Sequence, residues 1–208
     1  MVVKDLLKSY TRLDDRDLLQ RRDFKIEKLE NFFLITYGDT QIMGMYHLSV
    51  GTPYIDKPNE GIVSFNCVAA YKRTDKLNSF LKKIFINQRC IDLEALCIKY
   101  ATEVKLINIE LRILNSDGEV YEPSVLIVNH ILNHLKIPVN FLPVCFYFIA
   151  IDGVVVRDPT ELEENEKDWS YLVVHKSKNE FIYVVKIGKE NTLDDIYQVC
   201  EITSGSFE

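Results

Sequence analysis

A long strand, a tight turn and a helix follow one another after residue 102, and this succession constrains the fold more than any other part of the sequence. Residues 103–114 (EVKLINIELRIL) alternate apolar and polar side chains as a half-buried strand does. Asp117-Gly118 is typical of the turn that ends such a strand. Pro123 is tolerated at the first position of a helix, and residues 125–135 supply the apolar residues of that helix.

Two helical segments are expected just before this strand. Apolar residues fall at helical spacing between Leu77 and Phe85, which predicts a helix with one apolar stripe and with Lys82 and Arg89 on another face. In residues 89–97 (RCIDLEALC), Asp92 can accept backbone N–H groups at the start of a short helical turn.

The remaining segments alternate between strands and helices. We expect a short amphipathic helix over residues 3–10 and a final helix over 192–204, capped by Thr192 with Asp195 at the capping-box position. The expected strands are a three-stranded meander (FKIEKLE, FFLITYG and QIMGMYHLSV), a mostly buried strand (IVSFNCVAA), and two hairpins that turn at Asp152-Gly153 and Lys178-Asn179.

These elements predict an α+β fold in a single compact domain. The chain has 208 residues, of which 47% are hydrophobic, so it can bury a full core, and no linker divides it. The domain covers residues 1–208, with an N-terminal arm over 1–23 and a C-terminal helix over 192–208.

The cysteines and the hydropathy pattern indicate a protein inside the cell. Five cysteines, an odd number, are dispersed without a C-x-x-C pair, which favours reduced, buried thiols. The sequence contains no Asn-x-Ser/Thr sequon, no signal peptide and no apolar run of about 18 residues.

Charge is distributed unevenly along the chain. The formal net charge is −6, yet residues 1–100 carry 16 Lys+Arg against 13 Asp+Glu, while residues 101–208 carry 9 against 18. The basic residues of the first half are either ordinary solvated surface or, if several converge on one face, a site that attracts phosphates.

Six segments follow one another in a characteristic order along the chain: RLDDR (12–16), the turn at 38–40, EGIVSFN (60–66), RCIDLEALC (89–97), NSDGEV (115–120) and RDPTELEE (157–164). This order resembles the RNase PH-like ring subunits of the RNA exosome, and is closest to the polymyositis/scleroderma autoantigen type of non-catalytic subunit. The resemblance runs from Arg12 to about Gly188 and implies an RNase PH-like fold with mixed sheets. Asp15 stands where the family has glycine, so its turn needs another geometry or a left-handed aspartate.

The resemblance implies a role in a ring of six such folds around an RNA channel. S1- and KH-bearing cap proteins sit on one face of that ring, and a separate hydrolytic nuclease degrades the threaded single-stranded RNA. Lys82, Lys83 and Arg89 partly match positions where relatives place basic residues toward RNA, whereas Ile86 occupies one expected basic position. A solvated helix face is the alternative interpretation of these three residues. The implied location is the nucleus and nucleolus, and also the cytoplasm.

The site for inorganic phosphate departs from the family pattern. Phosphorolytic relatives present a Gly-Ser or Gly-Thr-Arg element after the Asp-Gly turn, at a helix N-terminus. Here Glu119 and Glu122 replace the expected glycine and cation, and Pro123 removes one N–H donor. We therefore expect phosphate binding to fail.

Part of the acidic machinery remains in the sequence. Asp158 and Glu164 keep the six-residue spacing of the carboxylates in active relatives, and Asp168 follows. The pair is either vestigial, a Mg²⁺ site or a charged surface turn. His130 and His134 lack the pattern of a zinc site, so no metal and no cofactor is expected.

These observations favour a non-catalytic structural subunit of the exosome core ring, acting in 3'–5' RNA processing and decay that includes rRNA maturation. Two alternatives stay open: a phosphate-dependent 3'–5' exoribonuclease and a free-standing RNA-binding module. No membrane is expected among its partners.

Overall fold

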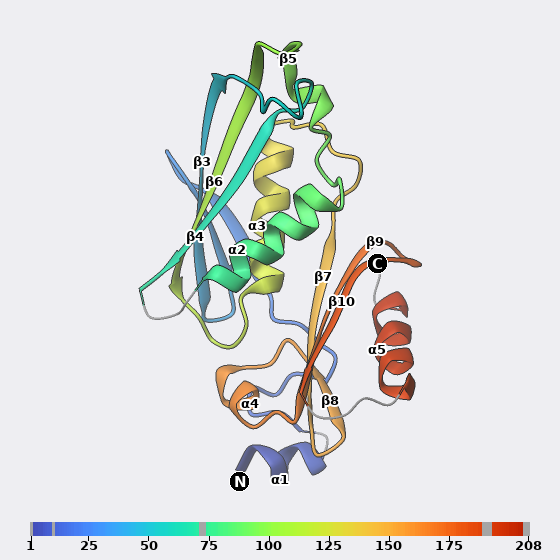
Figure 1. The fold of residues 1–208 in the computed structure, drawn as a ribbon. Coiled ribbons are helices and arrows are strands. Elements are labelled where there is room, and N and C mark those ends of the chain that lie inside the picture. The colour runs from blue at the N-terminus through green and yellow to red at the C-terminus, as the bar shows by residue number, and fades with distance from the viewer. Residues whose placement is uncertain (1, 10, 71–73, 189–192, 206–208) are drawn as a thin grey trace.

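Two β-sheets and five helices form the structure, a computed structural model that describes residues 2–9, 11–70, 74–188 and 193–205 (Figure 1). One sheet has six strands and the other has four. The helix α3 (Tyr121–His134) packs against β2 and β3 of the first sheet and against β7 of the second. The expected α+β architecture of mixed sheets and helices is therefore confirmed.

The six-stranded sheet has the order β1-β2-β3-β6-β4, with the short strand β5 paired to β6. The predicted meander and the predicted long strand are both present, and β6 pairs antiparallel with β3 and parallel with β4. The expectation of a mostly buried β4 was wrong, because β4 lies at the sheet edge and exposes alternate residues. The strands are β1 (Phe24–Lys28), β2 (Phe33–Tyr37), β3 (Thr40–Gly51), β4 (Ile62–Ala69), β5 (Cys97–Lys99) and β6 (Glu103–Asn115).

The four-stranded sheet is antiparallel throughout and has the order β10-β9-β7-β8. Both predicted hairpins are present, and Asp152 and Gly153 adopt the positive φ angles, 48° and 83°, that a tight two-residue turn requires. The strands are β7 (Val144–Ile151), β8 (Val154–Arg157), β9 (Trp169–Ser177) and β10 (Glu180–Gly188).

Four of the five α-helices match the sequence prediction in place, with one correction at the start of α3, whereas α4 was not predicted. That helix begins at Tyr121, so Pro123 is its third residue and not its first. Proline is still accommodated, because the N–H groups of the first helical turn have no partner within the helix. Thr192, the predicted cap of the last helix, lies outside the described residues, as does the side chain of Asp195. The other helices are α1 (Val2–Lys8), α2 (Asp75–Lys82), α4 (Glu161–Asn165) and α5 (Leu193–Gly205).

The main hydrophobic core lies between the two sheets and around α3. The predicted apolar stripe of α2 is buried in this core and continues through Ile84 and Phe85. All five cysteines are free thiols, but Cys97 and Cys200 are only half-buried, so the expectation of burial holds for the other three. Within the described residues, no helix is long and apolar enough to cross a membrane.

Candidate functional site

The expected position of the phosphate site is the N-terminus of α3, and the turn before this helix is tightly packed. Gly118 has a φ of 84°, and a Cβ atom there would lie 2.3 Å from the carbonyl oxygen of Pro159. Val120 precedes the helix, and its side chain provides no capping hydrogen bond. The close approach of Gly118 to Pro159 joins the start of α3 to the segment that leads into α4.

The two glutamates at this helix start point in different directions. Glu122 is only 4% exposed and accepts a hydrogen bond from Arg157 Nη2 at 3.0 Å. Burial raises the pKa of the Glu122 carboxyl, although Arg157 opposes that shift. Glu119 instead lines a surface cavity. The expected pair of phosphate-repelling carboxylates is therefore reduced to one, Glu119, because Glu122 is used to pair with Arg157.

The cavity beside Glu119 has a volume of about 550 Å³ and lies where α2, the start of α3 and the inner face of the four-stranded sheet meet. Aromatic rings form part of its wall, with the Phe80 and Tyr121 centroids 4.9 Å apart and the Phe80 and Tyr183 centroids 5.7 Å apart. The Lys83 ammonium lies 4.4 Å from the Tyr183 ring centroid. Lys83 therefore makes a cation–π interaction with another residue of the same chain.

Asp158 is the centre of a buried network of ion pairs. Arg22 Nη2 donates to Asp158 Oδ1 at 2.6 Å, and Arg16 Nη1 donates to Asp158 Oδ2 at 3.0 Å. The backbone N–H of Arg22 adds a third bond to Oδ2 at 2.7 Å. Burial alone would raise the pKa of this carboxyl, but the hydrogen bonds and charges of Arg22 and Arg16 lower it overall. Asp158 is 5% exposed and thus holds the N-terminal arm in place from a buried position.

Glu164 belongs to a different network, at the border of the aromatic cavity. Its Oε1 accepts a hydrogen bond from the Tyr147 hydroxyl at 2.9 Å and forms an ion pair with Lys167. Asp168 Oδ2 accepts the backbone N–H of Asp152 at 2.8 Å and so ties β9 to the β7–β8 hairpin. The three acidic residues singled out by spacing therefore do not form one acidic cluster.

The structure gives no sign of a metal site in the ranges it describes. No group of three or more His, Cys, Asp or Glu side chains gathers there. His130 and His134 instead contact the Phe33 ring edge-on, with centroid separations of 5.0 and 5.1 Å. Burial, followed by the charge of His134, lowers the pKa of His130.

A second buried ion pair, which sequence reasoning missed, joins the arm to α4. Arg12 is 2% exposed and donates two hydrogen bonds to Glu163. Arg12 Nε donates to Glu163 Oε1 at 3.0 Å, and Arg12 Nη2 donates to Glu163 Oε2 at 2.7 Å. Glu163 also closes a capping box with Thr160 at the start of α4. The T-x-x-E pattern of residues 160–163 is a capping-box signature, so the helix start was detectable from sequence.

The three predicted RNA-contacting residues are all exposed, but they do not share one site. Lys82 and Arg89 border adjoining hollows that have Lys57, Glu60 and Ile86 in common, whereas Lys83 faces the aromatic cavity. The expectation that Arg89 lies on a helix face was wrong. A π-helical turn over Lys83–Asn87 continues α2, and Arg89 lies two residues beyond its end with a left-handed φ of 54°.

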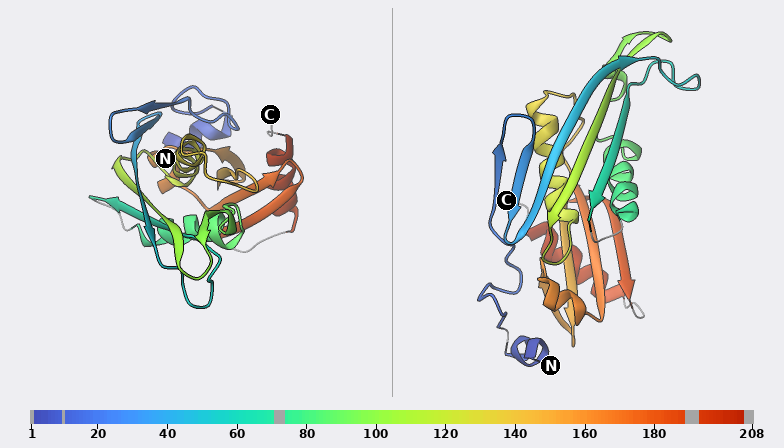
Figure 2. Two further views of the ribbon diagram at one scale, coloured as in Figure 1. Left: turned by 90° about the horizontal axis from the view of Figure 1, so that it is seen from above. Right: turned by 90° about the vertical axis from the view of Figure 1, so that its left-hand side faces the viewer.

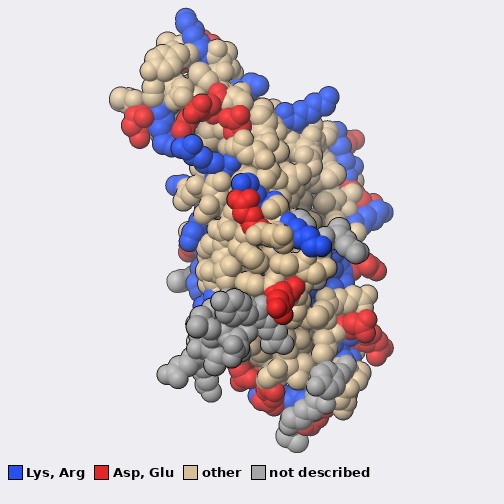
Figure 3. All heavy atoms as spheres, turned by 90° about the vertical axis from the view of Figure 1, so that its right-hand side faces the viewer, with Lys and Arg blue, Asp and Glu red and all other residues tan. Residues whose placement is uncertain are grey.

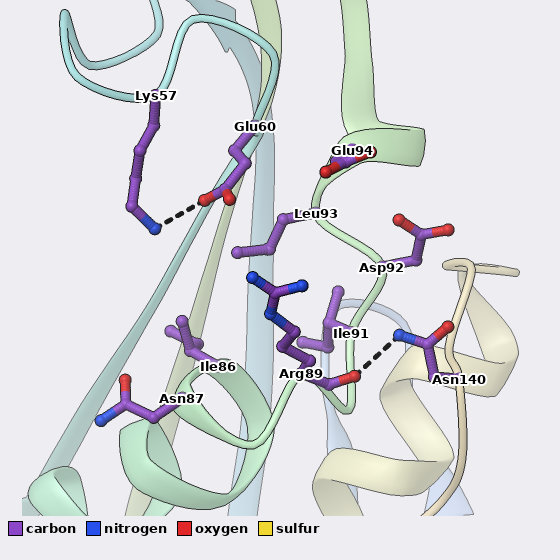
Figure 4. A pocket seen from close by; sticks show the side chains of 10 residues that line it. All are labelled: Lys57, Glu60, Ile86, Asn87, Arg89, Ile91, Asp92, Leu93, Glu94 and Asn140. Carbon is purple, nitrogen blue, oxygen red and sulfur yellow. Dashed lines mark hydrogen bonds and ion pairs between the residues drawn. The ribbon is translucent and has the colours of Figure 1, made fainter.

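The hollow around Arg89 is shown in Figure 4. The guanidinium of Arg89 extends between Ile86 and Leu93 toward Glu60, and its backbone carbonyl accepts a hydrogen bond from Asn140 Nδ2 at 2.8 Å. Lys57 forms an ion pair with Glu60 at 2.7 Å across the same hollow. Acidic and basic groups are therefore mixed here.

The charge distribution over one whole face agrees with this local picture. On the face drawn in Figure 3, blue and red side chains of the described residues are interspersed around a broad uncharged area.

Two sheets packed around α3, with buried ion pairs that hold the N-terminal arm against the segment after β8, define a fold that solved structures share. No family model matches the chain. A solved structure described as the Archaeoglobus fulgidus exosome with RNA bound to the active site superposes with a TM-score of 0.84 at 18% identity, covering 99% of this chain and 93% of that one. Rice (Oryza sativa) Rrp46 gives a TM-score of 0.77 at 18% identity, covering 94% of this chain and 96% of that one.

Sequence relatives point to the same class of protein. Exosome complex component RRP45 of Bos taurus is 23% identical over 93% of this chain and 53% of its own length. Exosome complex component Rrp42 of Methanothermobacter thermautotrophicus is 25% identical over 96% of this chain and 88% of its own length. The chain thus spans about half the length of the vertebrate RRP45 relatives. The predicted resemblance to RNase PH-like exosome subunits is confirmed.

Proposed function

We propose that the chain is a non-catalytic structural subunit of an RNA exosome core ring. Its relatives carry the names of exosome components, and its fold is that of exosome core proteins. In this role the chain forms interfaces with other RNase PH-like subunits and supplies one sector of the wall around the RNA. The ring serves 3'–5' RNA processing and decay, including rRNA maturation.

The single observation that carries the non-catalytic assignment is the position of Asp158. This carboxylate is 5% exposed and bonded to two guanidinium groups, so it is unavailable to a substrate. At the start of α3, Glu119 lines the cavity in the place of a phosphate-binding group. A carboxylate about 4 Å from a bound phosphate opposes it by roughly 1 kcal/mol in water and by several times that when partly buried.

The proposal includes the partners and the location that the resemblance implies. The partners are other RNase PH-like ring subunits, S1- and KH-bearing cap proteins, an associated hydrolytic nuclease and single-stranded RNA. The location is the nucleus and nucleolus, with a further pool in the cytoplasm. Affinity purification of the tagged chain, followed by identification of the co-purifying proteins, tests the partner set directly.

The complex is expected to release no nucleoside diphosphates through this subunit. The assay incubates purified complex with single-stranded RNA and orthophosphate, and compares the wild-type chain with Glu164→Gln, which alters one of the two carboxylates whose spacing matches that of active relatives. Equal diphosphate release from the two complexes supports the proposal. Release that depends on phosphate and disappears with Glu164→Gln would instead establish a phosphorolytic site in this chain.

The RNA contact is expected to involve Lys82 and Arg89 more than Lys83, because Lys83 is engaged with Tyr183 inside the cavity. Reversing both Lys82 and Arg89 to glutamate should weaken RNA binding by the assembled complex. It should also reduce the slope of log affinity against log salt by about 0.7 per lost phosphate contact. Lys83→Glu is the matched control and should leave that slope nearly unchanged.

Fluorescence anisotropy at several salt concentrations measures both quantities. An unchanged affinity after the double reversal would show that these two residues do not contact RNA. Salt-sensitive binding by the lone chain, equal to that of the complex, would favour a free-standing RNA-binding module.

A further inference from the structure

The hollow around Arg89 rests on a firmly held backbone. Arg89 has a left-handed φ of 54°, a conformation that costs free energy for an arginine. Its carbonyl accepts a hydrogen bond from Asn140 Nδ2 at 2.8 Å, and the Asn140 N–H donates to the Cys90 carbonyl at 2.7 Å. The Asp92 N–H donates to the Pro138 carbonyl at 3.0 Å. The segment before β7 therefore fixes the direction in which the Arg89 side chain leaves the backbone.

The guanidinium of Arg89 has no partner within the part of the chain that the structure describes. No hydrogen bond or ion pair joins it to any of those residues, and the side chain is exposed in the hollow. Figure 4 shows it between Ile86 and Leu93, directed toward Glu60. A strained residue whose side chain bonds nothing within the chain is typical of a binding site.

Glu60 also lines this hollow, and its backbone is held as well. It lies in the loop between β3 and β4, which Figure 2 (right) shows beside β5 at one end of the molecule. The Gly61 N–H donates to the Leu93 carbonyl at 2.8 Å. Lys57 Nζ donates to Glu60 Oε2 at 2.7 Å, and Oε1 has no hydrogen bond to a described residue. One carboxylate oxygen is therefore left for a ligand.

Apolar side chains complete a site for a flat ring. Ile86 and Leu93 are half-buried in the hollow, and Tyr54, which is 58% exposed, lines the adjoining one. The hollow has a volume of about 550 Å³. Apolar walls with a few fixed polar groups suit a heterocycle, whose faces pack against the walls and whose edges form hydrogen bonds.

We propose that this hollow receives a guanine base of single-stranded RNA. Arg89 donates to the O6 and N7 acceptors of the base, and Glu60 accepts from its N1–H and N2 amino groups. Adenine, cytosine and uracil each offer a single donor group on their hydrogen-bonding edges, so guanine alone offers adjacent donors to a carboxylate and adjacent acceptors to a guanidinium. The inference rests on the proposed function, because RNA must reach this surface, and adds a base preference to it.

The mixed charges of the hollow favour a base over a phosphate. A phosphate beside Arg89 would share the hollow with the Glu60 carboxylate, which opposes an anion. A neutral base meets no such repulsion and uses both charged groups. Lys82 is exposed in the adjoining hollow and forms no ion pair with a described residue, so it supplies the contact with the RNA phosphates.

Base analogues test the two contacts separately. The probes are unstructured, U-rich RNA strands that carry guanosine, inosine, 7-deazaguanosine or adenosine at the same positions. Inosine lacks the N2 amino group, and 7-deazaguanosine lacks the N7 acceptor. Fluorescence anisotropy with the assembled complex, and with the lone chain, should show that guanosine strands bind about tenfold tighter than each of the others.

Two substitutions assign these preferences to their residues. Glu60→Gln should abolish the preference for guanosine over inosine and keep that over 7-deazaguanosine. Arg89→Lys keeps the charge but loses the planar fork, so it should have the opposite effect. Glu27→Gln is the matched control, because Glu27 also pairs with a lysine at 2.7 Å but lies on β1, and it should keep both preferences.

Equal affinities of the wild-type protein for all four strands would overturn the inference and leave the ring assignment intact. A guanosine preference that survives both substitutions would equally overturn it. Each preference is a ratio measured on one protein sample, so a partly unfolded variant does not alter it. Failure of the chain to co-purify with ring subunits, while the lone chain still prefers guanosine, would count against the ring assignment alone.

Discussion

Replacing Asp158 with asparagine should lower the free energy of unfolding by about 3–5 kcal/mol, since removing one partner of a buried ion pair leaves the other charge uncompensated. Arg22, whose side chain is 7% exposed, and Arg16, at 11%, would keep their charges beside a neutral amide. Asparagine suits the test, because Asp158 has a left-handed φ of 48° that asparagine also tolerates. The loss then reports on charge and not on backbone strain.

Urea unfolding at neutral pH measures this loss. Asp23→Asn is the matched control, because Asp23 is exposed and adjacent in sequence to Arg22, and its substitution should change stability by less than about 0.5 kcal/mol. A loss below about 1 kcal/mol for Asp158→Asn would show that water reaches the network and screens it.

The same carboxyl gives a pH dependence with a definite sign. The pKa of Asp158 in the folded chain is lowered from its usual value of 3.8. The unfolded chain therefore binds this proton first as pH falls, and the stabilisation is present above the unfolded pKa and lost as pH falls through the folded one. Wild type should lose stability below about pH 4 more steeply than Asp158→Asn.

The sequence predicted most of the secondary structure because the apolar pattern and the turn residues agree with each other there. Residues 103–114 alternate cleanly and lie in β6, and Asp152-Gly153 turns the β7–β8 hairpin. Asp15, which replaces a family glycine, adopts the left-handed φ of 59° that the sequence left as one of two options. The error at β4 has a clear cause, since an apolar run does not distinguish a central strand from an edge strand.

The site was harder to predict because it depends on which distant residues meet. Spacing placed Asp158 and Glu164 together, but the first bonds to the arm and the second to Tyr147 of β7. Glu122 was expected to repel phosphate. Its side chain is instead buried and pairs with Arg157, which lies 35 positions away in sequence. No local pattern encodes these pairings.

The ion pair between Arg12 and Glu163 should show strong energetic coupling in a double-mutant cycle. Arg12→Met is expected to cost about 3–5 kcal/mol, because Glu163, which is 1% exposed, would lose a bidentate partner and remain charged in the interior. Glu163→Gln should cost less, since glutamine keeps an acceptor for Arg12 and suits the capping-box position.

The double variant should be more stable than the sum of the two losses implies, with a coupling energy of about 2–3 kcal/mol measured by urea unfolding. The matched control pairs Arg12→Met with Glu161→Gln, because Glu161 lies on the same helix but is exposed, and that cycle should show coupling of less than about 0.5 kcal/mol. Equal coupling in the two cycles would mean that Arg12 acts through the carbonyls of Arg157 and Asp158, which it also contacts at 3.0 Å each, and not through Glu163. The arm would then be held by backbone hydrogen bonds, and the charge of Glu163 would matter only for starting α4.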